Sequence, residues 1–190
     1  DVTLITAVTE GEILSAGNIL SDEDGLGTLS YQWIRDGSPI DGATSDNHTL
    51  TQADVGAAIT VEVSYTDGEG TFHSGNHNLI SAATPTVTNV NDSPAGTVTI
   101  SGTATQGQEL TASNDLTDED GMTTSTVSYQ WKRDNVAIDG ATSSTYTLTQ
   151  ADVGAAITVT ASYTDDFGQA ESVTSSATSA ATNISHFPTG

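Results

Sequence analysis

The sequence predicts an all-β protein made of two tandem β-sandwich domains. Residues 49–61 and 147–159 carry the same thirteen letters, TLTQADVGAAITV, ninety-eight positions apart. That period exceeds the 20–50 residues of a solenoid unit and matches one small β-sandwich. The composition, rich in Thr, Ser, Ala and Val, favours short strands over helices. We therefore expect one domain at residues 1–92 and a second at 93–190.

The first two strands of each repeat follow from short runs of apolar and β-branched residues. We expect the first strand at 2–5 and its counterpart at 98–100. A glycine turn then leads into a second strand, at 12–14 in the first repeat and at 109–111 in the second. Both repeats thus begin with a pair of strands.

The two central strands show the clearest alternation in the chain. Large apolar residues occupy every second position at 29–33 and 59–65, and the pattern returns at 127–131 and 157–163. Alternation with period two is typical of a strand with one buried face. Six of the ten aromatic residues lie on these strands and are expected in the cores: Tyr31, Trp33, Tyr65, Tyr129, Trp131 and Tyr163.

The last strand of each repeat is expected at 79–82 and at 177–181. A Trp on the third strand and an Asp-x-Gly corner before the sixth form an immunoglobulin-like pattern, with corners at 54–56 and 152–154. Cysteine is absent, so sheet packing alone must hold each sandwich. We expect two immunoglobulin-like domains joined end to end by the short linker 84–94.

The charge restricts the possible partners. The chain has twenty-five acidic residues and only three basic ones, Arg35, Lys132 and Arg133, which gives a net charge of −22. A phosphate backbone and an anionic membrane surface both require a basic face, so we expect neither nucleic acid nor membrane as a partner. No apolar run approaches the ~20 residues of a membrane span. Such an excess of acid repels itself unless counter-ions neutralise it.

Several motifs in order resemble one family over nearly the whole chain. Tyr-Gln-Trp, Gly-Ala-Thr, Leu-Thr-Gln-Ala-Asp-Val-Gly, Tyr-Thr-Asp and Asn-Val-Asn-Asp-x-Pro are similar to the immunoglobulin-like repeats of giant, type I secreted bacterial adhesins with RTX tails. The resemblance implies a monomeric extender on the bacterial cell surface, whose partners are neighbouring repeats of the same chain. The diagnostic RTX nonapeptides are absent. The chain starts and stops in repeat register, so we expect a fragment that leads into a further module from about residue 186.

The linker motif is also similar to that of cadherin-like domains, in which calcium sits between successive modules. Calcium requires six to eight oxygen ligands, and no single segment supplies them. Asp22 and Asp24 do not begin an EF-hand, because Trp33 occupies its twelfth position. In an immunoglobulin-like sandwich, however, the loops after the second and sixth strands gather at one end.

This topology predicts a calcium site at the interdomain junction. In the second repeat it groups the loop residues Asp118, Asp120 and Asp165 with the linker residues Asn91 and Asp92. The first repeat would add Glu12 and Asp54, and its own loop residues Asp22, Asp24 and Asp67 would form half of a preceding site. In the alternative, the acidic loops are solvated surface and Asp54 only caps its corner. After the second repeat we expect a weaker site or none, since Gln106, Gln108 and His186 replace acidic residues.

A zinc site formed by His73 and His77 is not expected. Four residues along a strand separate side chains by about 13 Å, beyond shared coordination. No catalytic spacing surrounds the Ser, His and Asp residues, so we do not expect an enzyme. The leading hypothesis is a calcium-rigidified spacer that holds a distal binding domain away from the cell. The alternative is a glycan- or protein-binding module, with Phe72, Tyr146, Phe167 and Phe187 as its remaining aromatic residues.

Overall fold

The chain folds as two compact units, Asp1–Val90 and Asn91–Gly190, in a computed structural model that describes residues 2–4, 8–75 and 79–184. The expected boundary lay two residues later, after Asp92. Asn91 and Asp92 belong to the second unit because they hydrogen-bond to Glu171 and Asp120 within it. The expectations for Ile5, for His77 and for the segment from residue 185 onwards lie outside the described residues.

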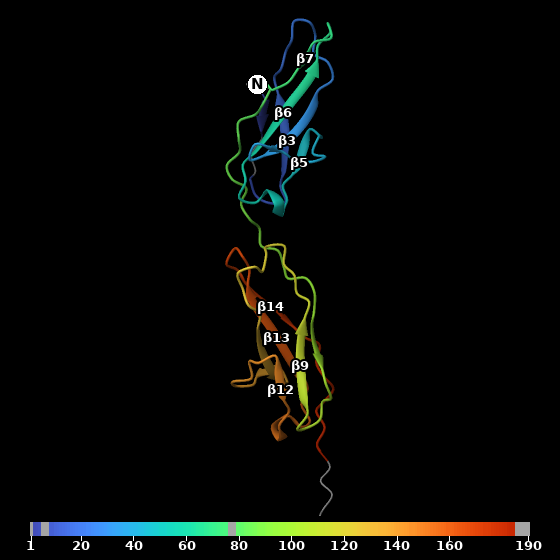
Figure 1. The fold of residues 1–190 in the computed structure, drawn as a ribbon, viewed down its shortest axis with the longest axis vertical. Coiled ribbons are helices and arrows are strands. Elements are labelled where there is room, and N and C mark those ends of the chain that lie inside the picture. Colours follow the sequence, from blue (N-terminus) through green and yellow to red (C-terminus); the bar gives the residue numbers. More distant parts are fainter. Residues whose placement is uncertain (1, 5–7, 76–78, 185–190) are drawn as a thin grey trace, which may run out of the picture. The chain divides into compact units, whose positions relative to one another are not determined.

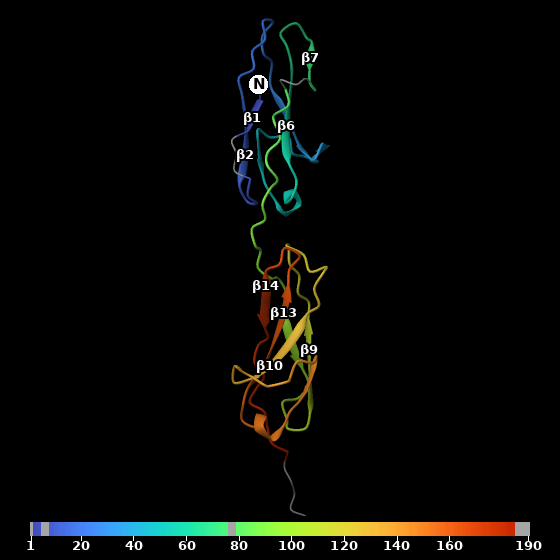
Figure 2. The ribbon, with the colours of Figure 1, turned by 90° about the vertical axis from the view of Figure 1, so that its left-hand side faces the viewer.

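The first domain is a sandwich of two antiparallel sheets (Figures 1 and 2). One sheet has the order β1-β2-β5, formed by Val2–Leu4, Ile13–Asn18 and Asn47–Thr49. The other has the order β4-β3-β6-β7, formed by Ser38–Pro39, Ser30–Arg35, Ile59–Thr66 and Phe72–His73. Figure 2 separates the layer that contains β1 and β2 from the layer that contains β6.

The second domain repeats this topology strand for strand. Its three-stranded sheet has the order β12-β9-β8, formed by Thr145–Thr147, Glu109–Asn114 and Val98–Ser101. Its four-stranded sheet has the order β11-β10-β13-β14, formed by Val136–Ala137, Ser128–Arg133, Ile157–Thr164 and Ala170–Thr174. The predicted fold class, an all-β pair of immunoglobulin-like domains, is confirmed. The short fourth strand pairs with the third, unlike the constant-type antibody arrangement, in which it joins the sheet of the first strand.

Each core is centred on a tryptophan of the third strand. Trp33 and Trp131 are fully buried, and their indole nitrogens donate to the backbone oxygens of Ser45 and Ser143. On β6 the residues alternate between buried and half-buried, as the sequence predicts. Four of the six aromatic residues expected in the cores are buried, whereas Tyr31 and Tyr129 are half-buried at the core edge.

The expected last strands were placed wrongly. Besides β3 and β10, the strands that pair with β6 and β13 are β7 and β14, which come earlier in the chain than the expected segments. Residues 177–181 form no strand, although Ala181 makes an isolated bridge to Val153. Residues 79–82 form no regular strand, but they lie beside β6 through the isolated bridge between Ile80 and Glu62 and through backbone hydrogen bonds from the Val63 amide to Leu79 and from the Ser81 amide to Val61. The helical content of the described residues is limited to the 3-10 turns η1, Gln52–Asp54, and η2, Gln150–Asp152, and neither could cross a membrane.

Candidate metal-binding sites

Two loops meet at one end of the second domain, as the sequence predicts. One follows β9 and contains Asp118 and Asp120, and the other joins β13 to β14. The Asp166 amide donates to the backbone oxygens of Asp120 and Gly121, at 3.3 Å in each case. These hydrogen bonds place the acidic residues of both loops in one neighbourhood.

Asp118 and Asp120 are held by hydrogen bonds that orient their carboxylates. The Asp120 amide donates to Asp118 Oδ1 at 3.0 Å, and the Tyr163 hydroxyl donates to Asp118 Oδ2. The Asp92 amide donates to Asp120 Oδ2 at 2.7 Å. Asp120 is only 1% exposed, and its Oδ1 has no hydrogen-bond partner among the described residues.

Asp165 has the same incomplete pairing. Its Oδ1 accepts from the amides of Phe167 and Gln169, at 2.9 and 2.8 Å. The residue is 2% exposed, and Oδ2 has no partner in the part of the chain that the structure describes. A buried carboxylate oxygen without a partner is unfavourable unless a cation or another donor neutralises it. Two such oxygens at one end of a domain make that end suitable for a cation.

The surroundings of Tyr163 show how close the acidic groups are. Burial is the largest effect that raises the pKa of the Tyr163 hydroxyl, followed by its hydrogen bond to Asp118. The negative charges of Glu171 and Asp165 raise it further. The phenol therefore stays protonated and donates to Asp118.

The linker reaches the same end of the second domain. Asn91 Nδ2 donates to Glu171 Oε1 at 2.9 Å and to the backbone oxygen of Asp92 at 3.0 Å. Glu171 was missed in the sequence, although its place opposite Tyr163 on β14 brings it to the acidic loops. Its counterpart His73 lies opposite Tyr65 in the first domain, so aligning the two repeats offered the signal.

Asp166 is occupied by other partners. Its carboxylate accepts hydrogen bonds from the amides and hydroxyls of Thr123 and Thr124, at 2.7 to 3.2 Å. The Thr123 hydroxyl has the largest effect and, with the other donors, lowers the pKa of Asp166 to about 2. Asp166 is therefore a loop-stabilising residue rather than a free ligand.

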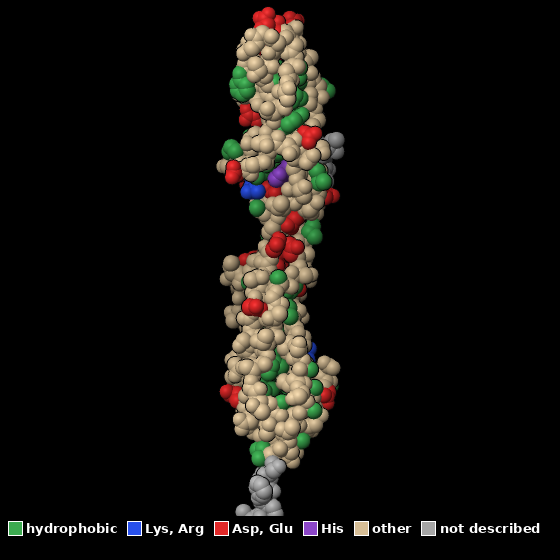
Figure 3. Space-filling view, turned by 90° about the vertical axis from the view of Figure 1, so that its right-hand side faces the viewer, with side chains coloured by type: hydrophobic (Ala, Val, Ile, Leu, Met, Phe, Trp, Pro, Cys, Tyr) green, Lys and Arg blue, Asp and Glu red, His purple; other side chains and the backbone are tan. Residues whose placement is uncertain are grey.

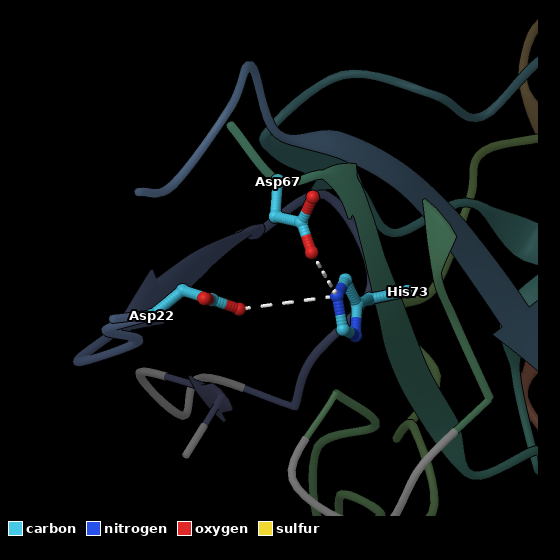
Figure 4. A group of neighbouring side chains, drawn as sticks. All are labelled: Asp22, Asp67 and His73. Carbon is cyan, nitrogen blue, oxygen red and sulfur yellow. Dashed lines mark hydrogen bonds and ion pairs between the residues drawn. The ribbon is translucent and has the colours of Figure 1, made fainter. Parts of the chain in front are cut away.

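The equivalent end of the first domain contains a histidine. Asp22 and Asp67 converge on His73 of β7, as Figure 4 shows. His73 Nε2 lies 3.0 Å from Asp67 Oδ2 and 3.9 Å from Asp22 Oδ2. The hydrogen bond to His73 is the main cause that lowers the pKa of Asp67. Asp24 is exposed, and its amide donates to Asp22 Oδ1.

Asp54 is not placed as a metal ligand. It is fully buried, and Arg35 donates to its Oδ1 through Nε at 2.8 Å and through a terminal nitrogen at 2.7 Å. Its Oδ2 accepts from the amide and hydroxyl of Thr51 and lies 3.2 Å from His48 Nε2. Since the Arg35 guanidinium neutralises Asp54 and both of its oxygens accept hydrogen bonds, Asp54 has the alternative role considered from the sequence, the cap of its corner. We exclude it from the ligand set.

Glu12 also interacts within its own turn, where its Oε2 accepts from the Thr9 amide at 3.1 Å. The expectation that Glu12 contributes to the calcium site stays a prediction from the sequence.

More generally, acidic side chains are spread over the face drawn in Figure 3, and basic ones are rare there.

Comparisons with known proteins identify no family. No protein-family model and no curated protein matches the chain. Among solved structures, it is similar to three N-terminal domains of the Highly Immunogenic Outer Capsid protein (Hoc) of bacteriophage RB49, with 19% identity and a TM-score of 0.32 over 92% of this chain. The chain spans only 57% of that structure.

Two further structures have comparable similarity. The fibronectin(III)-like modules of Clostridium thermocellum CbhA share 13% identity and a TM-score of 0.30, with both chains covered in full. The amphioxus IgVJ-C2 molecule shares 14% identity and a TM-score of 0.33 over 87% of this chain and 97% of its own. The sheet order described above, and not these similarities, shows that the chain is a pair of immunoglobulin-like β-sandwich domains.

Proposed function

We propose that the chain consists of structural extender modules of a large bacterial surface adhesin, stiffened by calcium. The observation that carries the calcium part is the pair of buried carboxylates, Asp120 and Asp165, each with one oxygen that has no hydrogen-bond partner among the described residues. The adhesin part is supported by the resemblance of the repeat motifs and by the net charge of −22. The proposal assigns no catalytic role to either domain.

The ligand chemistry at this end of the second domain suits calcium. Calcium binds carboxylate, amide and backbone oxygens in a flexible shell of six to eight ligands. Asp118, Asp120, Asp165 and Glu171 offer carboxylate oxygens, and Asn91 offers an amide oxygen. No His or Cys is among them, so the set favours a hard cation over a transition metal.

Binding at this site would act on the linker through Asp92. The Asp92 amide already donates to the Asp120 carboxylate, and Asn91 donates to Glu171. A cation held by Asp120 would remove the repulsion between these carboxylates and so strengthen the attachment of residues 91–92 to the domain. The linker would then have fewer freely rotating residues, which is the property that an extender requires.

Calcium titration by calorimetry tests the site, with Asp120→Asn and Asp165→Asn as variants. Each amide keeps the size of the side chain and one acceptor oxygen but removes its negative charge. We expect calcium binding in the wild-type chain and a loss of affinity in both variants. Asp139→Asn is the matched control, because Asp139 is exposed in a turn away from these loops and its substitution changes the charge equally.

Small-angle scattering tests the mechanical part of the proposal. We expect the maximum dimension of the wild-type chain to fall when a chelator replaces calcium, and the response to be absent in Asp165→Asn. An unchanged maximum dimension would refute the stiffening role. Equal calcium affinity in the wild type and Asp165→Asn would refute the site.

A further inference from the structure

We propose that the first domain carries a separate transition-metal site, formed by Asp22, Asp67 and His73, that takes Zn²⁺. The ligand atoms, two carboxylate oxygens and one imidazole nitrogen, all lie within 4.8 Å of one another. They come from three different segments: the loop after β2, the turn that follows β6 and the strand β7 (Figure 4). The pair of His73 with His77, which the sequence argues against, is not needed, because Asp22 and Asp67 approach His73 from the loop after β2 and the turn after β6.

The two distances from His73 to the carboxylates lie close to those around a small tetrahedral ion. Zinc binds His nitrogen and carboxylate oxygen at about 2.0–2.2 Å, which places neighbouring ligand atoms about 3.3 Å apart in a tetrahedron. His73 Nε2 lies 3.0 Å from Asp67 Oδ2 and 3.9 Å from Asp22 Oδ2, on either side of that value. Small side-chain rotations would bring both into range. Three protein ligands leave the fourth position to water.

Each carboxylate is oriented by donors outside the group, as metal ligands commonly are. Asp67 Oδ1 accepts from the amides of Glu69 and Thr71, at 3.0 and 2.7 Å, which directs Oδ2 towards His73. The Tyr65 hydroxyl donates to Asp22 Oδ2 at 2.9 Å. The Tyr65 ring also stacks on the imidazole, with centroids 4.8 Å apart and planes inclined by 16°. The group is thus oriented before any ion binds.

The nature of the ligands distinguishes this group from the calcium site of the second domain. An imidazole nitrogen favours zinc and similar ions, whereas an all-oxygen set favours calcium. The two domains use the same positions: Asp67 corresponds to Asp165, and Glu171 takes the place of His73. Asp165 Oδ2 has no partner among the described residues, but Asp67 Oδ2 has His73. One change of residue would therefore change the metal preference of an otherwise repeated scaffold.

The inference does not depend on the calcium proposal, because the two sites share no residue. The chain should be stripped of metal and then saturated with calcium, which occupies all-oxygen sites before zinc is added. Calorimetric titration with Zn²⁺ is then expected to show one equivalent bound to the wild type. A histidine ring-nitrogen NMR spectrum should show the Nε2 resonance of His73 shift on zinc addition.

Variants assign the zinc site to these residues. His73→Glu introduces the residue that the second domain has at this position. It should weaken zinc binding by at least about tenfold, since the loss of a ligand reduces affinity at least as much as the loss of an outer-shell partner. Tyr65→Phe removes one orienting hydrogen bond and should weaken binding by roughly tenfold. His48→Tyr is the matched control, because Tyr146 occupies that position in the second domain, and it should leave zinc binding unchanged.

A gain of function gives the sharpest outcome. Glu171→His should add a second zinc equivalent in the second domain, and melting curves in calcium show whether each variant is folded. The inference is overturned if the wild type binds no zinc at micromolar concentration, or if folded His73→Glu binds it as tightly as the wild type. The two proposals fail separately: Asp165→Asn should lose calcium but keep zinc, and His73→Glu should do the reverse.

Discussion

At the scale of single residues, the two corner aspartates connect the 3-10 turns to the third strands. Asp54 accepts hydrogen bonds from Arg35, and Asp152 accepts equivalent bonds from Arg133. Burial by itself would raise the pKa of both carboxyls, but hydrogen bonds from Thr51, Thr149 and the arginines outweigh it and hold both pKa values below the ordinary range. Both aspartates are therefore charged at neutral pH and depend on their arginines.

Replacing the arginine should destabilise one domain at a time. Arg35→Ala leaves the buried Asp54 without its counter-charge, and removing one partner of a buried pair costs about 3–5 kcal/mol. In calorimetry we expect Arg35→Ala to lower the melting temperature of the first domain alone. Arg133→Ala should lower that of the second domain alone. Lys132→Ala is the control, since Lys132 has no ion pair among the described residues. Equal melting temperatures of the second domain in Arg133→Ala and Lys132→Ala would contradict the prediction.

Asp166 should make the second domain sensitive to acid. Its pKa of about 2 in the folded state lies below the ordinary value of an aspartate, about 3.9. A lowered pKa contributes stability at higher pH, and that contribution disappears as the pH falls from about 4 to about 2.

The variant Asp166→Asn should therefore lose less stability than the wild type over that pH interval. The measurement is the melting temperature of the second domain, followed in chelator so that calcium does not contribute. Parallel curves for the two proteins would show that the Thr123 and Thr124 hydrogen bonds do not depend on the charge.

At the scale of elements, side-chain hydroxyls replace a regular edge strand beside the sixth strand. The Val159 amide donates to Ser175 Oγ and the Ile157 amide donates to Thr178 Oγ1, both at 3.1 Å. Ser81 and Thr84 do the same for Val61 and Ile59 in the first domain. Backbone carbonyls would accept from these amides in a regular strand. The segments after β7 and β14 still bond to the sheet through their backbones, for example from the Ser81 amide to Val61 and from the Ser175 amide to Val159, so they form an irregular edge rather than a strand.

The variant Ser175→Ala tests the role of these hydroxyl acceptors. The variant leaves the buried Val159 amide without its acceptor, which costs about 1–3 kcal/mol. We expect faster hydrogen exchange at Val159 than in the wild type, with Ser176→Ala, at the exposed neighbouring position, as the control. Unchanged exchange at Val159 would mean that another acceptor takes over.

At the scale of the whole molecule, the excess of negative charge opposes folding. With a net charge of −22 on 190 residues, mutual repulsion acts on both domains. Salt shortens its range, from about 30 Å at 0.01 M to about 3 Å at 1 M ionic strength.

Without calcium, both domains should melt at higher temperature as sodium chloride is raised over that range. Replacing sodium by choline separates screening from specific cation binding, because a bulky organic cation screens but fits no carboxylate site. A melting temperature that does not rise with salt would show that the acidic residues are too dispersed to repel appreciably.

Part of the candidate site could be predicted from the order of the strands. Asp118, Asp120 and Asp165 lie at the same end of the domain because the loops after the second and sixth strands share one end of a sandwich. Glu171 was missed as a ligand, and His73 was considered only with His77 and rejected, because their actual neighbours depend on the register of β14 with β13 and of β7 with β6. That register is set by the length of the connecting turn, which composition does not reveal.

The sequence by itself determined the repeat, the all-β class and the buried faces, because these follow from local periodicity. Only the tertiary structure decided what each carboxylate does. Asp54 and Asp165 are the same residue type and both are buried, yet Asp54 is saturated with donors whereas Asp165 keeps an oxygen without a partner among the described residues. The difference arises from which donors the fold brings to each side chain from distant segments, and local sequence does not contain that information.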